Sequence, residues 1–229
     1  PVALNRACKL TTWFMKKNKT YVGIMKIHKE VEEETLLGEM QKFVGKIMQL
    51  PPVKSRVKRQ EREREVYSWK ILEYVKGKKE VLFSCEVEAG TYIRKLISDL
   101  GIVIGGSHMA ELRRTKAGIF SEENEGFVNL YQLEEAVKEY KEGKEEKLRK
   151  LIIRGEEAIK KIIKVVEAKK EKINQLLRGK PIFADDLIGE IGKIKESEVF
   201  ALFSENRLIG VYRKVDEGEI VARSEWVMN

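Results

Sequence analysis

Apolar and polar residues alternate along much of the first 120 residues, which is the period of strands buried on one face. Two stretches instead carry apolar residues three and four positions apart, as amphipathic helices do. Gly77 falls between two expected strands and predicts a hairpin turn, and Thr91 is placed to cap the second helix. The expected strands span residues 20–30, 66–73, 79–87, 108–115 and 119–120, and the expected helices 35–44 and 92–100, ending at Gly45 and Gly101.

Residues 48–65 break this alternation. Pro51-Pro52 stiffens the backbone and prevents regular structure. Beyond Val57 the stretch 54–65 has almost no aliphatic side chain, so it cannot pack as core. We therefore predict an exposed, mobile, basic loop. Its basic residues are Lys54, Arg56, Lys58, Arg59, Arg62 and Arg64.

The second half of the chain changes character. Residues 131–178 are heavily charged but carry apolar stripes at helical spacing, so we predict helices divided at Gly143 and Gly155. Residues 169–172 are expected to form a linker or an exposed turn. Short alternating stretches then return and predict a small all-β module at about 168–229. Its expected strands span residues 199–203, 208–211 and 219–222.

Charge narrows the class of partner. The formal net charge is +8 and the charged fraction is 36%, which favours a polyanion such as nucleic acid or an anionic membrane. A basic protein without such a partner is the alternative. No apolar run approaches the ~18 residues of a membrane span. No metal site is expected, because the spacing typical of zinc sites is absent among Cys8, Cys85, His28 and His108. The two cysteines are expected to be free thiols, as in a protein of a reducing, intracellular (cytoplasmic) compartment.

Three groups of residues are candidates for chemistry. Arg94 would lie in the first turn of the helix after Gly90, half buried among apolar residues, and would then need a carboxylate partner. Tyr21 at a strand end can stack on a base. Arg113 and Arg114 would point to opposite faces of a strand. The plainer alternatives are a structural ion pair, a core or edge tyrosine, and a solvated strand edge.

Taken together and in this order, the motifs are similar to those of a known family. They are Lys19-Thr20-Tyr21, Gln49-Leu50-Pro51-Pro52 with Lys54-Ser55, Gly90-Thr91-Tyr92-Ile93-Arg94-Lys95-Leu96, and Leu112-Arg113-Arg114-Thr115 with Gly118. Over roughly residues 1–120 the chain resembles the TruB family of pseudouridine synthases. From Leu176 it bears a looser resemblance to a PUA module. The resemblance implies an α+β fold: a mixed, mostly antiparallel sheet in a partial catalytic domain, followed by a small all-β PUA barrel.

The resemblance also implies an activity and residue roles. The family flips a uridine out of the RNA and isomerises it to pseudouridine through an aspartate, without cofactor or metal. Tyr21 would stack on the base, Tyr92 would line the pocket, and Leu112 would supply apolar packing. Arg94 would pair with the aspartate and keep it ionised.

The aspartate itself is not expected within these residues. In the family it lies just before a stretch that Pro1-Val2-Ala3-Leu4 resembles. The available aspartates (Asp99, Asp185, Asp186 and Asp216) stand in other contexts. We therefore expect this polypeptide alone to be inactive, with the nucleophile supplied by an upstream segment or a companion chain.

The resemblance predicts RNA contacts in two domains, 1–167 and 168–229. The loop at about 49–66 resembles the family's thumb loop. Lys180 and the Asp185-Asp186 pair depart from the usual PUA pattern. The expected RNA-binding residues are Lys54, Arg56, Lys58, Arg59, Arg113, Arg114, Arg178, Gly179 and Lys180.

The charged stretch at 148–159 is similar to the archaeal and eukaryotic H/ACA-guided, dyskerin-type branch. That branch implies several partners: a guide RNA, substrate ribosomal or transfer RNA, small H/ACA core proteins and a kink-turn-binding ribosomal-type protein. Two other interpretations stay open. One is a guide-independent transfer-RNA pseudouridine synthase, and the other is a degenerate RNA-binding scaffold without activity.

Overall fold

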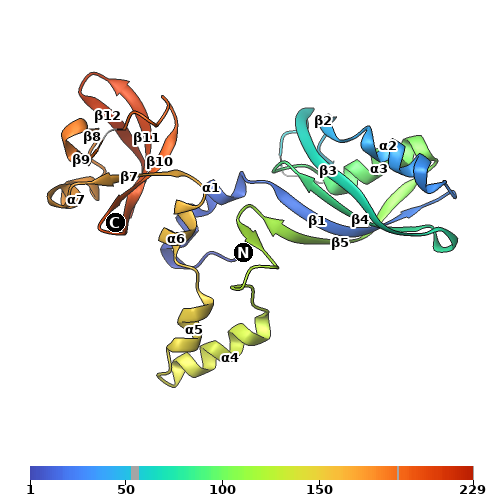
Figure 1. Cartoon of the computed structure of the whole chain (residues 1–229), viewed down its shortest axis with the longest axis horizontal. Helices are drawn as coiled ribbons and strands as arrows, with labels where there is room; N and C mark the ends of the chain where they lie inside the picture. Colours follow the sequence, from blue (N-terminus) through green and yellow to red (C-terminus); the bar gives the residue numbers. More distant parts are fainter. Residues whose placement is uncertain (53–56, 190, 229) are drawn as a thin grey trace. The chain divides into compact units, whose positions relative to one another are not determined.

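The computed structural model describes residues 1–52, 57–189 and 191–228. The polypeptide divides into two compact units, one of Pro1 with residues 14–124 and one of residues 2–13 with 125–229. Figure 1 shows the elements of both. Within the described ranges no helix is long and apolar enough to cross a membrane. The predicted RNA contacts of Lys54 and Arg56 lie outside the described residues.

The first unit is built on one six-stranded sheet in the order β2-β3-β4-β1-β5-β6, and each neighbouring pair is antiparallel. Two helices cover one face of this sheet (Figure 1). The strands are β1 (Lys19–Ile27), β2 (Gly45–Gln49), β3 (Arg62–Val75), β4 (Glu80–Val87), β5 (Ser107–Ala117) and β6 (Phe120–Ser121). The helices of this unit are α2 (Glu33–Gln41) and α3 (Ile93–Ile104), with η2 (Lys76–Lys78) between β3 and β4. Earlier in the sequence, η1 (Asn5–Leu10) belongs to the second unit and α1 (Thr11–Met15) is divided between the two units.

The core of this unit follows from the period of its central strand. Along β4 every second side chain is buried, from Val81 through Phe83 and Cys85 to Val87. Residues three and four apart on α3, such as Leu96 and Leu100, are buried against that face. The expected hairpin of β3 and β4 is confirmed, and its turn is η2.

Two expectations for the first unit are wrong in detail. The helix α2 ends at Gln41, and Gly45 begins the unexpected strand β2 instead of ending the helix. β2 pairs with residues 62–66, so the predicted basic loop becomes strand from Arg62 onward. Gln49 and Val66 of these strands are buried, and such short alternation is easily missed beside Pro51-Pro52.

The helix α3 also differs from expectation at both ends. It continues through Gly101 to Ile104, and Gly105 ends it in the left-handed conformation, with φ +86°. Gly101 is needed for packing, because a Cβ there would lie 2.5 Å from the backbone nitrogen of Ser107. Thr91 is not the cap; Tyr92 takes the N-cap position.

The second unit contains a six-stranded sheet in the order β8-β12-β11-β10-β7-β9. Its two edge strands, β8 and β9, are joined by a three-residue 3-10 turn, so the sheet curls until it nearly closes. Phe200 and Tyr212 stack inside, 6.3 Å apart. The elements are β7 (Lys164–Ala168), η3 (Lys170–Lys172), α7 (Ile173–Leu176), β8 (Ile182–Phe183), η4 (Ala184–Asp186), β9 (Leu187–Ile188), β10 (Val199–Ser204), β11 (Arg207–Glu217) and β12 (Ile220–Val227).

The expected strands of this module are confirmed as β10, β11 and β12. The expected helix over residues 131–178 is wrong at its end, because residues 164–168 form β7, which pairs with β10 in parallel. The β-branched residues Val165 and Val166 suit a strand and outweigh the helical spacing. The sheet thus begins at Lys164, and the expected linker at 169–172 includes η3.

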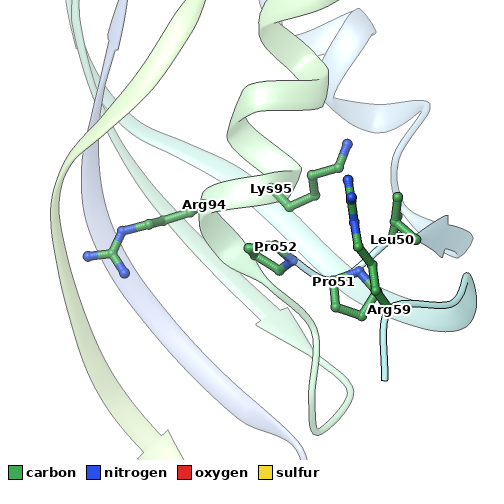
Figure 2. A pocket seen from close by; sticks show the side chains of 6 residues that line it. All are labelled: Leu50, Pro51, Pro52, Arg59, Arg94 and Lys95. Atoms are coloured by element: carbon green, nitrogen blue, oxygen red, sulfur yellow. The ribbon is translucent and has the colours of Figure 1, made fainter. Parts of the chain in front are cut away.

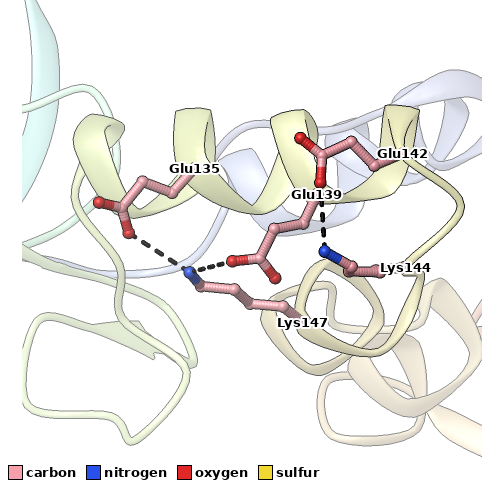
Figure 3. A network of polar contacts seen from close by, with 5 residues as sticks. All are labelled: Glu135, Glu139, Glu142, Lys144 and Lys147. Carbon is pink, nitrogen blue, oxygen red and sulfur yellow. Dashed lines mark hydrogen bonds and ion pairs between the residues drawn. The ribbon is translucent and has the colours of Figure 1, made fainter.

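Three helices lie between β6 and β7 in the sequence: α4 (Leu130–Lys141), α5 (Glu146–Leu151) and α6 (Gly155–Lys160). Asn129 and Gln132 form a reciprocal capping box at the start of α4. Figure 3 shows Lys147 of α5 bridging Glu135 and Glu139 of α4, at 3.3 and 2.9 Å. The bond to Glu139 is the largest cause that raises the pKa of Lys147. Because Glu135 is exposed and Glu139 and Lys147 are only partly buried, these ion pairs should add little to stability.

Candidate active site

The site is organised around the turn that leads into α3. Gly90 has φ +90°, a conformation that favours glycine. A Cβ at this position would lie 3.3 Å from the guanidinium of Arg64, so that side chain lies across the turn. Arg64 also lies 3.9 Å from Glu88. The chain therefore enters α3 along a defined path.

A buried glutamine fixes the first residue of that helix. The Gln49 side chain accepts a bond from the Tyr92 amide at 3.0 Å and donates one to the Tyr92 carbonyl at 3.3 Å. Gln49 is only 2% exposed, so these bonds are shielded from water. Gln49 belongs to one of the sequence motifs, but the motif predicted no role for its side chain. Its signal was a polar residue at an inward position of a short strand.

Arg94 does not have the environment expected for it. Ile93, Leu96 and Ile97 are buried, whereas Arg94 points to the other side of the helix and is exposed. The prediction of a half-buried guanidinium is therefore wrong, and no cost of burying an unpaired charge arises. Among residues 1–52, 57–189 and 191–228, Arg94 forms no ion pair; Asp99, one turn further on, pairs with Lys95.

Arg94 nonetheless borders a pocket of about 280 Å³. Three of its lining residues are apolar and three are cationic. Figure 2 shows that Arg94 extends away from Lys95 and Arg59, so the positive charges are spread around the opening. Lys58, in the same loop as Arg59, is exposed as well. The residues that line the pocket are Leu50, Pro51, Pro52, Arg59, Arg94 and Lys95.

Tyr21 and Leu112 lie on the face of the sheet that the helices cover. Tyr21 is paired across the ladder with Cys85, and Gly23 with Leu112, and opposed residues of an antiparallel pair share a face. Both side chains pack, partly buried, against the core. Gly23 leaves room for Leu112, since a Cβ there would lie 3.0 Å from its Cδ1. The Tyr21 side chain thus packs against the core while part of it stays accessible to solvent.

The two adjacent arginines do point to opposite faces, as expected. Arg114 is opposite Tyr21 and shares its face, whereas Arg113 is opposite Val22 and forms an ion pair with Glu122 at 2.7 Å. Both side chains are exposed, so neither is inward in the sense of being buried. Burial lowers the pKa of Lys19, and the positive charge of Arg114 lowers it further. Arg114 therefore adds charge beside Tyr21.

In the second unit, the three predicted RNA-binding residues are adjacent. Gly179 turns the chain at φ +82°, and Arg178 is exposed. The Lys180 ammonium donates a hydrogen bond to the Gln175 side chain at 2.9 Å. It also lies 5.2 Å from the centre of the Phe183 ring, a cation–π contact. Asp186, flagged as atypical in the sequence, is buried and accepts a bond from the Phe183 amide at 3.0 Å.

Comparison with known proteins places this arrangement in a family. A family model described as the tRNA pseudouridylate synthase B C-terminal domain matches residues 94–160. A protein of Saccharolobus solfataricus named "Probable tRNA pseudouridine synthase B" is 36% identical over 221 residues, covering 96% of this chain and 86% of that protein. The chain belongs to the TruB family of pseudouridine synthases. The resemblance drawn from the motifs is thereby confirmed.

A TruB-family relative of Nanoarchaeum equitans with the same name is 43% identical over 167 residues, covering 72% of this chain and 47% of that protein. This chain therefore spans about half the length of that relative.

Solved structures of the family agree with the fold. The chain matches a crystal structure of a Cbf5-Nop10-Gar1 complex with TM-score 0.85 and 32% identity, covering 100% of this chain and 72% of that one. It matches a structure of an H/ACA RNP bound to a substrate RNA with TM-score 0.83 and 30% identity, covering 99% and 71%. The expected fold class, an α+β domain with a small β-barrel, is confirmed.

Proposed function

We propose that this chain forms the substrate-positioning and RNA-binding part of a TruB-type enzyme that isomerises uridine to pseudouridine in ribosomal or transfer RNA. The observation that carries the proposal is Arg94 at the first turn of α3. It is held in place through Tyr92 and Gln49, borders a basic pocket, and forms no ion pair in the part of the chain that the structure describes. An exposed, positioned cation of this kind suits a partner from outside.

The proposed roles follow the arrangement of the side chains. Tyr21 stacks on the flipped base, Tyr92 lines the pocket, and Leu112 packs against the base from the adjoining strand. The guanidinium of Arg94 holds a carboxylate ionised, since an opposite charge within about 4–6 Å lowers the pKa of an acid. That carboxylate, supplied from outside these residues, drives cleavage of the glycosidic bond. The uracil then turns and rejoins the ribose through carbon.

The proposed RNA contacts are electrostatic. Exposed lysines and arginines bind phosphates without reading the base sequence. Lys58 and Arg59 border or adjoin the pocket, and Arg114 lies beside Tyr21 on the same face of the sheet. In the module proposed at 168–229 as a PUA domain, Arg178 is the exposed candidate beside Gly179 and Lys180. The catalytic domain is proposed to end at residue 167, so most of β7, which belongs to the β-barrel sheet, falls within that proposed range.

The guided mode of action is the preferred form of the proposal. It is supported by the two solved structures, whose titles name Nop10, Gar1 and an H/ACA RNP with substrate RNA. On this proposal the partners are a guide RNA, small H/ACA core proteins and a kink-turn-binding ribosomal-type protein. A guide-independent transfer-RNA enzyme is the second candidate, favoured by the printed names of the curated relatives.

The proposal is tested on protein purified from native cells together with its accompanying polypeptides and RNA. We expect a guide RNA and a polypeptide bearing the carboxylate to co-purify, and the assembly to form pseudouridine in a guide-directed substrate. The 229-residue chain alone should form none. Turnover on transfer RNA without a guide would support the second candidate. RNA binding with no turnover in any assembly would overturn the proposal and favour a scaffold.

A further inference from the structure

A second pocket lies within the second unit, where α6 ends and β7 begins. Its volume is about 460 Å³, and it is lined by residues 160–164 together with Glu198 and Val199. β7 and β10 run in parallel, so the pocket is at the end of the sheet where both strands begin. Among the described residues, its lining does not include Arg178 or Lys180, for which RNA contacts are already proposed.

The pocket carries excess positive charge. Lys160, Lys161 and Lys164 supply three ammonium groups, and all three side chains are exposed. Glu198 is the one carboxylate in the described lining; it accepts the Lys195 amide at 2.8 Å and pairs with Lys164 at 3.0 Å. The bond from the Lys195 amide and then the contact with Lys164 lower the pKa of Glu198. Glu198 therefore stays ionised and offsets only Lys164.

Lys160 and Lys161 have neutral surroundings. The Lys160 ammonium lies 4.5 Å from the centre of the Phe203 ring and 3.4 Å from the side-chain oxygen of Asn206, and neither of these groups carries a charge. Within residues 1–52, 57–189 and 191–228, neither lysine forms an ion pair. Neighbouring cations without a counter-charge repel each other, so an anion bound between them removes that repulsion.

The remaining lining residues are apolar. Ile162, Ile163 and Val199 are each partly buried, so apolar surface adjoins the cations. A free phosphate ion would leave that surface in water, whereas a nucleotide brings a base and a ribose to cover it. The volume also falls in the range of about 300–1,000 Å³ that is usual for sites of small molecules.

We propose that this pocket binds one nucleotide of an unpaired RNA segment, with its phosphate between Lys160 and Lys161 and its base or ribose against Ile163 and Val199. The inference rests on the proposed function, because that function makes RNA the partner of this chain. It adds a contact to the RNA in the second unit that is separate from Arg178.

The sheet register supports one RNA strand reaching both places. A row of paired residues crosses four strands from the pocket to the turn at Gly179, whose carbonyl accepts the Ser224 hydroxyl at 3.4 Å. The row consists of Lys164, Phe200, Tyr212 and Ser224. Three strand spacings of about 4.8 Å make ~14 Å along the curved sheet, so a strand that contacts Arg178 reaches the pocket within a few nucleotides.

The test is filter binding of the full chain to a short, unstructured oligouridylate at several salt concentrations. We expect Lys161→Ala to weaken binding several-fold at low salt and to reduce the slope of log affinity against log salt by about 0.7, the value for one lost contact to a single-stranded phosphate. Lys150→Ala, which removes an exposed lysine of α5 in the same unit, is the matched control and should leave the slope unchanged. Ile163→Ala should weaken binding with the wild-type slope, because it removes apolar contact and no charge.

Equal slopes in Lys161→Ala and Lys150→Ala would overturn the inference. Polyglutamate that binds as tightly as the oligouridylate, and more weakly to Lys161→Ala, would also overturn it and make the pocket a site for acidic peptides. Circular dichroism should show both lysine variants folded, since these side chains are exposed. Weaker RNA binding in Arg59→Ala but not in Lys161→Ala would remove this inference alone, whereas no RNA binding by the wild-type chain would remove the proposed function as well.

Discussion

The β-barrel of the second unit and the start of α3 differ in whether their buried polar groups have hydrogen-bond partners. In the barrel, the Tyr212 hydroxyl donates to the Leu176 carbonyl at 2.9 Å and the Ser204 hydroxyl to the Ala168 carbonyl at 3.0 Å. Asp186 accepts the Phe183 amide and faces Lys172 at 3.2 Å. Every one of these buried groups is satisfied from within the unit, as stable cores require.

Near the start of α3 the opposite holds. The Thr91 hydroxyl and the Arg62 Nε atom are buried without a hydrogen-bond partner among the described residues. Arg94 and Arg59 present charge at a pocket. Unsatisfied buried groups cost free energy unless another molecule pairs with them, and Trp69 Nε1 in the core of the first unit is a further such atom. The buried polar groups of the barrel are thus satisfied within their own unit, whereas the start of α3 leaves polar atoms and cations that the proposed RNA or partner polypeptide would pair with.

The largest expected effect separates function from stability at Arg94. Arg94→Ala should lower kcat of the assembled enzyme at least 100-fold, because the carboxylate loses the cation that keeps it ionised. Its free energy of unfolding should change by less than about 0.5 kcal/mol, since the side chain is exposed. Lys95→Ala, at the same pocket, is the control and should cost less than tenfold. Equal losses in the two variants would remove Arg94 from its proposed role.

At Asp186 we expect a substitution to lower stability and not to act first on turnover. Asp186→Ala should destabilise the second unit by about 3 kcal/mol, because it leaves the Phe183 amide and Lys172 without their buried partner. Urea unfolding measures the loss. Its neighbour Asp185 is exposed, so Asp185→Ala should stay within about 0.5 kcal/mol of wild type. Similar stability of the two variants would show that the bonds of Asp186 contribute little to the stability of the barrel.

Gln49 connects the two kinds of effect. Gln49→Ala should cost about 2 kcal/mol of stability by leaving both backbone groups of Tyr92 unpaired. It should also lower kcat more than it raises KM, because the start of α3 loses its fixed position. Gln41→Ala, which removes one bond to the Trp69 carbonyl, is the control and should reduce stability alone. An unchanged kcat in Gln49→Ala would limit this residue to a structural role.

Arg59 should affect binding more than turnover. Arg59→Ala should weaken RNA binding several-fold at low salt and reduce the slope of log affinity against log salt by about 1, as expected for one lost phosphate contact. Filter binding at several salt concentrations measures both. Lys46→Ala removes an exposed lysine that is paired with Glu63 and should leave the slope unchanged. The same slope in both variants would argue against a phosphate contact at Arg59.

The smallest effect concerns the buried thiol of the first unit. Burial raises the pKa of Cys85 to about 12, whereas an unfolded chain ionises this group at about 8.5. As pH rises above about 8.5 the unfolded state loses its proton first, so stability declines toward pH 12. Unfolding measured from pH 8 to 11 should show a shallower decline in Cys85→Ala than in wild type. Parallel curves would contradict this.

The sequence predicted the α+β class and most strands because period-two alternation reports burial on one face directly. It failed where a short element lacked enough residues to show a period, as in β2, and where two periods were compatible, as in β7. The motifs selected Tyr21, Tyr92, Arg94 and Leu112 as candidate site residues, which remains a prediction. They did not reveal the environment of each residue, because whether Arg94 is buried depends on which side of α3 meets the sheet.

The role of Gln49 was also beyond the sequence. Its two bonds to Tyr92 join residues 43 positions apart, and only the paired strands bring them together.

Photo-crosslinking tests the central claim most directly, because it requires no turnover. A substrate RNA with a single 4-thiouridine at the target position is bound and irradiated, and the linked peptide is identified by mass spectrometry. The account predicts crosslinks to peptides containing Tyr21, Tyr92 or Leu112, reduced in Arg59→Ala. Crosslinks confined to residues 168–229 would contradict it.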